Sequence, residues 1–174
     1  PLSILGAYYH IVAHALMKIT LFMCAGAIIV TAHKDNISDM HGIGKKMPIT
    51  MACYTVASLG IAGMPFVIGF ISKWNLGLGA LQVGQPLYIA ILIASALLSL
   101  SYLMPVTYLA FFKPNEKGEF KTYGEANKFM LIPICVTAAL SVILGIMPNF
   151  GPHLYDLASM AAQSITQGWI GGGW

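Results

Sequence analysis

The sequence predicts an all-α integral membrane protein with about four transmembrane helices, the second of them discontinuous, and a C-terminal segment at the membrane interface. Three observations lead to this fold class. Hydrophobic residues make up 57% of the chain and charged residues only 9%, whereas roughly a quarter of a soluble domain is charged. Long apolar runs alternate with short polar loops, as in a multi-span protein. The second apolar run is too long for one straight crossing.

The first apolar run, residues 4–32, is long enough to cross a bilayer, since about 20 residues suffice. It contains His10, His14 and Lys18, and their spacing of four places them on one helical face. Lys18 falls near the middle of the run, where a cation costs about 2.5 kcal/mol or more. This ladder of titratable groups predicts part of a path for protons or cations.

The second run, residues 48–83, would form a straight helix of about 54 Å, against a hydrocarbon core of about 30 Å. Gly63 and Pro65 supply a break, because proline removes a helical hydrogen bond and glycine loosens the turn. We therefore expect two half-helices at 48–62 and 66–82. Binding sites of transporters tend to lie at such interrupted helices, where freed backbone groups line a cavity.

Lys73 lies in the second half-helix, about 15 Å below the turn at residues 84–86. Lys18 has a similar depth, and a lysine side chain of about 6 Å cannot reach the interface from there. Ionisable groups so deep in a membrane are functional candidates by default. Desolvation favours the neutral amine, so such a lysine can take up and release a proton. We predict a relay formed by Lys73, Lys18, His14 and His10.

Two further spans are expected at residues 87–112 and 129–147. Seven of the nine lysines then lie in the loops 33–47 and 113–128, which share one face of the membrane. The positive-inside rule predicts that both loops are cytoplasmic and both chain ends are outside.

We expect a transmembrane part at residues 1–148 and a tail at 149–174 that lies on the membrane surface as an amphipathic helix, with Trp169 and Trp174 as anchors. Packing of the tail on another part of the protein is the alternative. The chain begins with Pro1 almost at the first helix, which suggests a piece of a longer protein.

Other kinds of site are disfavoured. Cys24, Cys53 and Cys135 lie far apart in apolar runs without CxxC spacing, so we interpret them as packing residues rather than as a disulfide framework or an iron–sulfur site. The pair His10 and His14 lacks further zinc ligands nearby and shares one helix, which argues against zinc and against bis-histidine haem. We predict no metal and no cofactor. A net charge of +3 without a basic stripe does not suggest nucleic acid as a partner.

Three motifs in order resemble the proton-conducting antiporter-like membrane subunits of respiratory complex I, of membrane-bound hydrogenases and of Mrp sodium/proton antiporters (the D-type subunit). Residues 10–26 match the signature HxxxHAxxKxxLFxxxG, residues 37–48 resemble the loop that follows it, and residues 59–74 resemble the interrupted helix with its buried lysine. The resemblance covers most of residues 8–113.

Members of that family have about fourteen spans, built from two inverted repeats of five helices with one broken helix each. The resemblance implies that this chain corresponds to the family's helices eleven to fourteen, without the first repeat. Lys18 and Lys73 would belong to a central polar axis, with Lys73 nearest the exit toward the outside. A lysine at position 73 resembles the Mrp D-type and hydrogenase-type subunits more than the complex I subunit that has glutamate there.

The function expected from residues and resemblance together is translocation of protons, with coupled Na⁺ as an open alternative, in the cytoplasmic membrane of a prokaryote. The partners would be the lipid bilayer and other membrane subunits of a redox pump or an antiporter, and the chain itself would hold no catalytic redox site. Two alternatives belong to other classes. One is a structural assembly subunit without its own ion path, and the other, disfavoured for lack of a ligand pair, is a redox subunit that binds quinone or haem.

Overall fold

The computed structural model describes residues 2–113 and 124–171, with the side chains from 168 onward excepted. None of the described residues lies in a β-strand, so the predicted all-α fold is confirmed. The helices are α1 (Leu2–Ala32), α2 (Pro48–Ala62), α3 (Ile68–Gln82), α4 (Leu87–Phe111), α5 (Lys128–Ile146) and α6 (Leu154–Gly171), with short 3-10 helices at Ile37–Asp39 and Ile43–Lys45.

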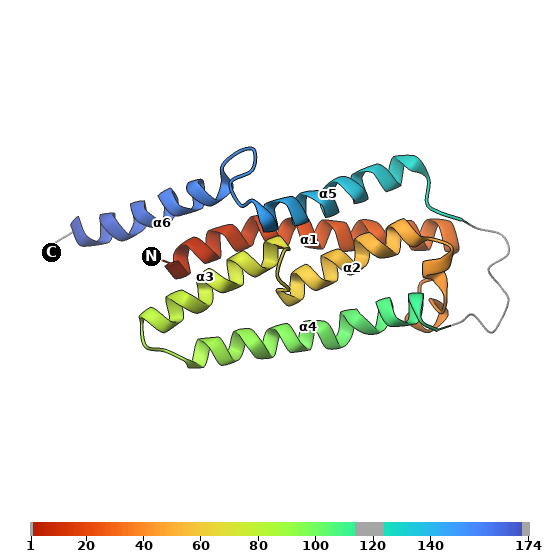
Figure 1. Ribbon diagram of the computed structural model, residues 1–174, viewed down its shortest axis with the longest axis horizontal. Coiled ribbons are helices and arrows are strands. Elements are labelled where there is room, and N and C mark those ends of the chain that lie inside the picture. Colours follow the sequence, from red (N-terminus) through yellow and green to blue (C-terminus); the bar gives the residue numbers. More distant parts are fainter. Residues whose placement is uncertain (1, 114–123, 172–174) are drawn as a thin grey trace.

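The helices form an elongated bundle organised around α1, which contacts α2, α3, α5 and α6 (Figure 1). Helices α2 and α3 follow each other along α1, and α4 runs back beside them (Figure 1). The C-terminal ends of α1 and α4 and the start of α5 lie at one end of the bundle, and the turn between α3 and α4 lies at the other end together with the start of α1 (Figure 1).

Three helices, α1, α4 and α5, are long and apolar enough to cross a membrane. The α2–α3 pair is the fourth element, and the break between Ala62 and Ile68 confirms that it is discontinuous. Helix α2 coincides with the predicted half-helix 48–62, whereas α3 begins two residues later than predicted. Most of α4 faces outward, with buried side chains only in its second half. These features fit an integral membrane protein whose outer face is apolar.

Part of the first polar loop, residues 33–47, packs against the bundle. The backbone N–H of Gly42 donates to the carbonyl of Leu109 at 3.0 Å, and Ile43 and Met47 are fully buried. Lys45 and Lys46 remain exposed, as expected for loop charges. The loop therefore ties the ends of α1, α2 and α4 together.

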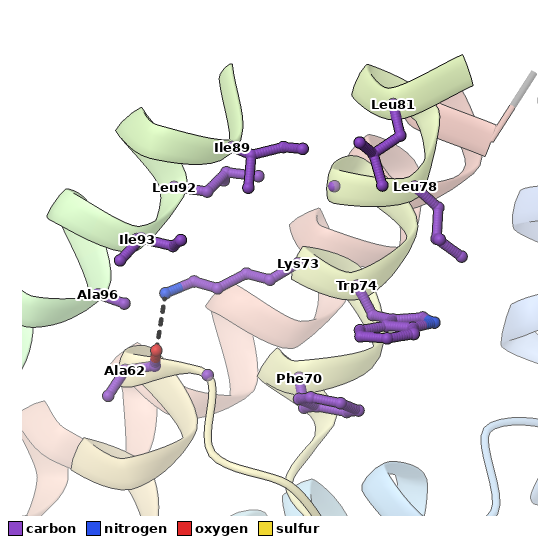
Figure 2. Close-up of a pocket in the computed structure, with 12 residues that line it drawn as sticks. Ala62, Phe70, Lys73, Trp74, Leu78, Leu81, Ile89, Leu92, Ile93 and Ala96 are labelled. Carbon is purple, nitrogen blue, oxygen red and sulfur yellow. Dashed lines mark hydrogen bonds between the residues drawn. The ribbon is translucent and has the colours of Figure 1, made fainter. Parts of the chain in front are cut away.

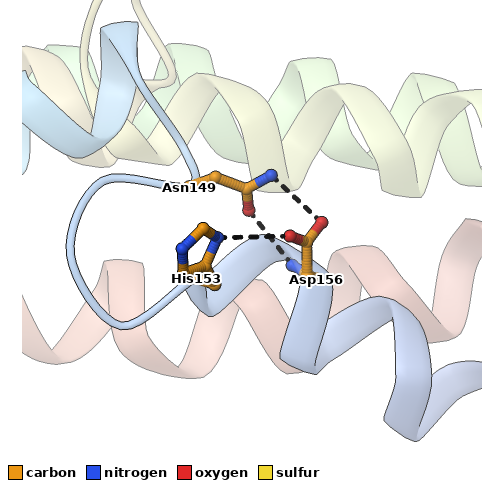
Figure 3. Close-up of polar contacts among 3 residues, drawn as sticks. All are labelled: Asn149, His153 and Asp156. Carbon is orange, nitrogen blue, oxygen red and sulfur yellow. Dashed lines mark hydrogen bonds and ion pairs between the residues drawn. The ribbon is translucent and has the colours of Figure 1, made fainter.

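The tail contains helix α6, which packs on α1 and follows a turn closed by Asn149, His153 and Asp156 (Figure 3). Asn149 and Asp156 bond reciprocally, since the amide donates to the carboxylate at 3.0 Å and the backbone N–H of Asp156 donates back at 3.2 Å. Helix α6 buries Ala158 and Ala162. The placement of this tail on a membrane surface stays a prediction, and the anchors Trp169 and Trp174 lie outside the described side chains.

Candidate ion-relay site

The break begins where α2 ends in a left-handed glycine. Gly63 has φ +90°, a conformation that is strained for any residue with a Cβ atom. Its N–H donates to the carbonyls of Leu59 (3.1 Å) and Gly60 (3.0 Å), and the N–H of Met64 also donates to Leu59 (3.0 Å). This turn is a Schellman-type cap, which satisfies two of the four carbonyls that a helix end leaves without intrahelical donors.

Lys73 satisfies the other two carbonyls. Its Nζ donates to the carbonyl oxygen of Ile61 at 2.6 Å and to that of Ala62 at 3.2 Å. Figure 2 shows the second of these bonds. Because the C-terminal end of a helix carries partial negative charge, an ammonium group is electrostatically favoured at this position. The four terminal carbonyls of α2 are thus all hydrogen-bonded, two by the backbone and two by one side chain from α3.

Small residues allow α3 to return so close to the end of α2. A Cβ atom on Gly63 would lie 2.8 Å from Cδ of Lys73, so glycine leaves room for the lysine to cross the cap. A Cβ atom on Gly69 would collide with the backbone carbonyl of Gly60. Pro65 lies exposed within the break, where its missing N–H removes no helical hydrogen bond.

Lys73 also lines a cavity of about 320 Å³ between α3, α4 and the end of α2 (Figure 2). The amine points toward α4, near Ile93 and Ala96 (Figure 2). Lys73 is the only charged residue among those that line the cavity, which are otherwise apolar or glycine. The lysine is half-buried. Release of a proton from Lys73 therefore removes the positive charge at the cavity, and uptake of a proton restores it.

His10 joins α1 to the same region. Its Nδ1 lies 2.8 Å from Oγ of Ser72, the residue before Lys73. Ser72 is fully buried and its hydroxyl donates to the carbonyl of Gly69 at 3.0 Å. Since a hydroxyl has one proton, His10 donates to Ser72 when both bonds are made. His10 and Lys73 are also close enough for an electrostatic interaction.

His14 and Lys18 continue from His10 along α1. The rings of His10 and His14 have centroids 5.8 Å apart, and Nζ of Lys18 lies 5.9 Å from the ring centroid of Phe22. His14 is exposed and Lys18 is half-buried, so both lie on a face that the described helices leave largely open. The structure therefore joins His10 to Ser72, the residue before Lys73, while His14 and Lys18 form an extension along α1.

Sequence reasoning missed a polar contact beyond the lysine. Asn75, buried one turn from Ile71, donates to that residue's carbonyl at 2.9 Å and accepts from the hydroxyl of Tyr155 on α6 at 3.3 Å. The ring of Tyr155 also meets that of Tyr9 edge to face, with centroids 5.7 Å apart. Only the position of Asn75, two residues after Lys73 in an apolar run, signals this contact in the sequence.

A second missed residue is Glu125, in the polar segment before α5. Its carboxylate accepts from the backbone N–H of Ile49 at 2.9 Å and from the hydroxyl of Thr50, at the first turn of α2. Glu125 and Thr50 are 75 residues apart, so no local pattern could pair them.

Comparison with known proteins places the chain. A family described as "NADH:quinone oxidoreductase/Mrp antiporter, TM" matches residues 2–112. NADH-quinone oxidoreductase subunit N of Desulforudis audaxviator is 36% identical over 156 residues, which cover 83% of this chain and 31% of that protein. F(420)H(2) dehydrogenase subunit N of Methanosarcina mazei is 30% identical over 180 residues, covering 95% of this chain and 34% of that protein.

Two solved structures resemble the fold. The archaeal membrane-bound sulfane sulfur reductase has a chain with a TM-score of 0.74 and 29% identity, covering 84% of this chain and 24% of that one. The Mrp complex of Dietzia sp. gives a TM-score of 0.77 at 17% identity, over 89% of this chain and 37% of that one, and so supports the fold alone. This chain spans about a third of the length of the relatives it matches. It belongs to the family of transmembrane subunits shared by NADH:quinone oxidoreductases and Mrp antiporters.

Proposed function

We propose that the chain carries protons through part of an antiporter-like membrane subunit, and that Lys73, His10, His14 and Lys18 are the groups that pass them on. The observation that carries this proposal is the position of Lys73. Its amine bonds the broken end of α2 and lines a cavity, and the preceding residue in the sequence, Ser72, bonds His10. The family supports proton translocation as the general function.

In this mechanism Lys73 exchanges a proton with the cavity on one side and with His10 on the other. The proton passes between them over Ser72 or a water molecule, since both ring nitrogens of histidine can bind or release a proton. His14 and Lys18, each one helical turn further along α1, continue the path. A four-residue step rises about 6 Å along the helix axis, and water molecules would connect the successive groups.

The proposed orientation places the loops 33–47 and 113–128 in the cytoplasm and both ends of the chain outside, in the cytoplasmic membrane of a prokaryote. The clustering of lysine in those loops supports it. The ends of α1 and α4 and the start of α5, which flank these two loops, lie at the same end of the bundle (Figure 1). The cavity beside Lys73 then lies on the route toward the outer face.

Protons are favoured over Na⁺ as the transported ion at this site. The carbonyl oxygens of Ile61 and Ala62 are hard ligands of the kind that Na⁺ prefers, but Lys73 donates to both. A sodium ion would have to displace an ammonium group of the same charge. Sodium coupling would therefore need ligands elsewhere in the protein.

The test is transport by the complete subunit in its membrane complex, reconstituted in vesicles with a pH-sensitive dye inside. Lys73→Ala should abolish proton movement while the complex still assembles, and His14→Ala should slow it less, because water can replace an exposed relay member. Lys45→Ala, at an exposed loop position, is the control for a lost lysine. Full transport by Lys73→Ala would overturn the proposal. A complex that falls apart without Lys73, with normal transport by the assembled fraction, would indicate an assembly role instead.

A further inference from the structure

The three cysteines converge in space although they are far apart in the sequence. Cys24 comes from α1, Cys53 from α2 and Cys135 from α5, and all three are free thiols. They belong to one apolar cluster near the loop end of the bundle, and each is close enough to the others for an electrostatic interaction. The sequence-based interpretation as separate packing residues therefore missed this grouping.

Two of the thiols form a pair that differs from the third. Cys53 on α2 and Cys135 on α5 lie close enough for an electrostatic interaction and border the same cavity. Cys24 is fully buried and its thiol donates to the backbone carbonyl of Thr50 at 3.4 Å. The thiol of Cys24 is therefore directed to the backbone of α2, while Cys53 and Cys135 share a cavity that Cys24 does not line.

The pair also borders open space. Cys53 and Cys135 line a cavity of about 220 Å³ between α2 and α5. The other lining residues are all small or aliphatic: Ala52, Val56, Ala138, Ala139 and Val142. A neutral, apolar reagent that dissolves in the bilayer fits this surface better than a charged one, since an ion would lose its hydration there.

We propose that Cys53 and Cys135 form a dithiol site for trivalent organoarsenicals, such as phenylarsine oxide. In the reaction the As=O group and two S–H groups give two As–S bonds, and the two thiol protons leave with the oxygen as water. Arsenic stays trivalent, so no oxidant or reductant takes part. The two sulfurs are enough for this product, whereas a tetrahedral zinc site needs four ligands.

A bridge of this kind connects α2 to α5. Cys53 lies eight residues before Ile61, whose carbonyl accepts from Lys73, and eight residues correspond to about 12 Å along a helix. The reagent would therefore immobilise α2, whose terminal carbonyls accept hydrogen bonds from Lys73. It would not contact Lys73 itself. Binding at the thiols does not depend on the proposed transport function.

The experiment treats the complete subunit, in its membrane complex, with phenylarsine oxide and identifies arsenic adducts by mass spectrometry of the digested protein. We expect a single arsenic that links the peptides containing Cys53 and Cys135, released by dimercaptopropanol but not by a monothiol. Cys53→Ser and Cys135→Ser should each remove this adduct. Cys24→Ser is the matched control and should retain it.

Elution of each variant complex on size exclusion, compared with the unsubstituted protein, shows that a lost adduct is not a lost fold. Cys53→Ala and Cys135→Ala serve where a serine variant does not assemble. An adduct that includes Cys24 in place of either partner, or adducts that a monothiol releases, would overturn the assignment. So would the lack of an arsenic bridge between these two peptides in the intact complex.

Discussion

Both ends of α2 are capped by charged side chains that are distant in sequence. A carboxylate accepts from free N–H groups at one end, and an amine donates to free carbonyls at the other. At its N-terminal end the carboxylate of Glu125 accepts from Ile49 and Thr50. At its C-terminal end the amine of Lys73 donates to Ile61 and Ala62. Each charge has the sign that the helix dipole favours at that end.

The surroundings of the two ends of α2 indicate a different role for each charge. Glu125 lies at the loop end of the bundle and holds the segment before α5 against α2. Lys73 lies at a break in the middle of the α2–α3 element, beside a cavity and next to a histidine contact. We interpret the carboxylate as a structural cap and the amine as the group that also moves protons. Substitutions at three positions test this difference, and a fourth tests the neighbouring contact between α3 and α6.

The largest expected effect comes from Lys73→Met, which keeps the length of the side chain and removes its charge and its N–H donors. Proton transport in reconstituted vesicles should fall to background. The carbonyls of Ile61 and Ala62 also lose their partners, which costs about 1–3 kcal/mol for each buried group. Lys73→Arg keeps donors and charge but does not release a proton, so it should restore stability without transport. Transport by either variant would contradict the role of Lys73.

Gly63→Ala should have the next largest effect, because alanine at φ +90° is strained and its Cβ would lie 2.8 Å from Lys73 Cδ. The strain costs about 1–3 kcal/mol, and the shift of Lys73 should slow transport. Thermal unfolding in detergent and vesicle transport measure the two effects. Gly26→Ala, on α1 with open space at its Cβ position and away from the Lys73 cavity, is the control. Equal stability of both variants would show that alanine at position 63 is not strained.

Glu125→Gln should lower stability and leave transport intact. The amide oxygen of glutamine can keep one hydrogen bond. The substitution nevertheless removes the negative charge at the start of α2, which lowers the free energy of unfolding by about 1 kcal/mol. The unfolding midpoint in detergent should fall, whereas the initial rate of proton movement should match the unsubstituted protein. A transport defect of the size seen for Lys73 variants would mean that the two ends of α2 do not differ in function.

Tyr155→Phe should have the smallest effect. It removes the hydroxyl that donates to Asn75 and keeps the ring that packs on Tyr9. We expect a loss of about 0.5–1 kcal/mol, read from the unfolding midpoint, with little change in transport. Tyr155→Ala, which also removes the ring contact, should destabilise more. If both variants have the same unfolding midpoint, the ring of Tyr155 adds no stability beyond that of its hydroxyl.

The position of the break was predictable because two independent signals coincide, the excess length of the apolar run and the residues Gly63 and Pro65. Helix α3 begins later than predicted because Phe66 has φ +71° and Val67 is extended. Neither residue signals this in the sequence, since no side chain caps the start of α3.

The partners of the charged groups were not predictable. Lys73 bonds two backbone carbonyls, and a sequence does not show which carbonyls a break leaves free in space. The pairing of His10 with Ser72 depends on the packing of α1 against α3, 62 residues away. The relay through His14 and Lys18 stays a prediction, since their open face offers no contact that tests it.

The hydrogen bonds at the end of α2 also have a thermodynamic consequence. A charged donor makes a stronger bond than a neutral one, so protonated Lys73 stabilises the last turn of α2 more than the neutral amine does. Linkage then works in both directions. Any movement that loosens this turn makes the proton easier to lose, and loss of the proton loosens the turn. The broken helix is therefore a place where mechanical work on the backbone and proton binding can be exchanged.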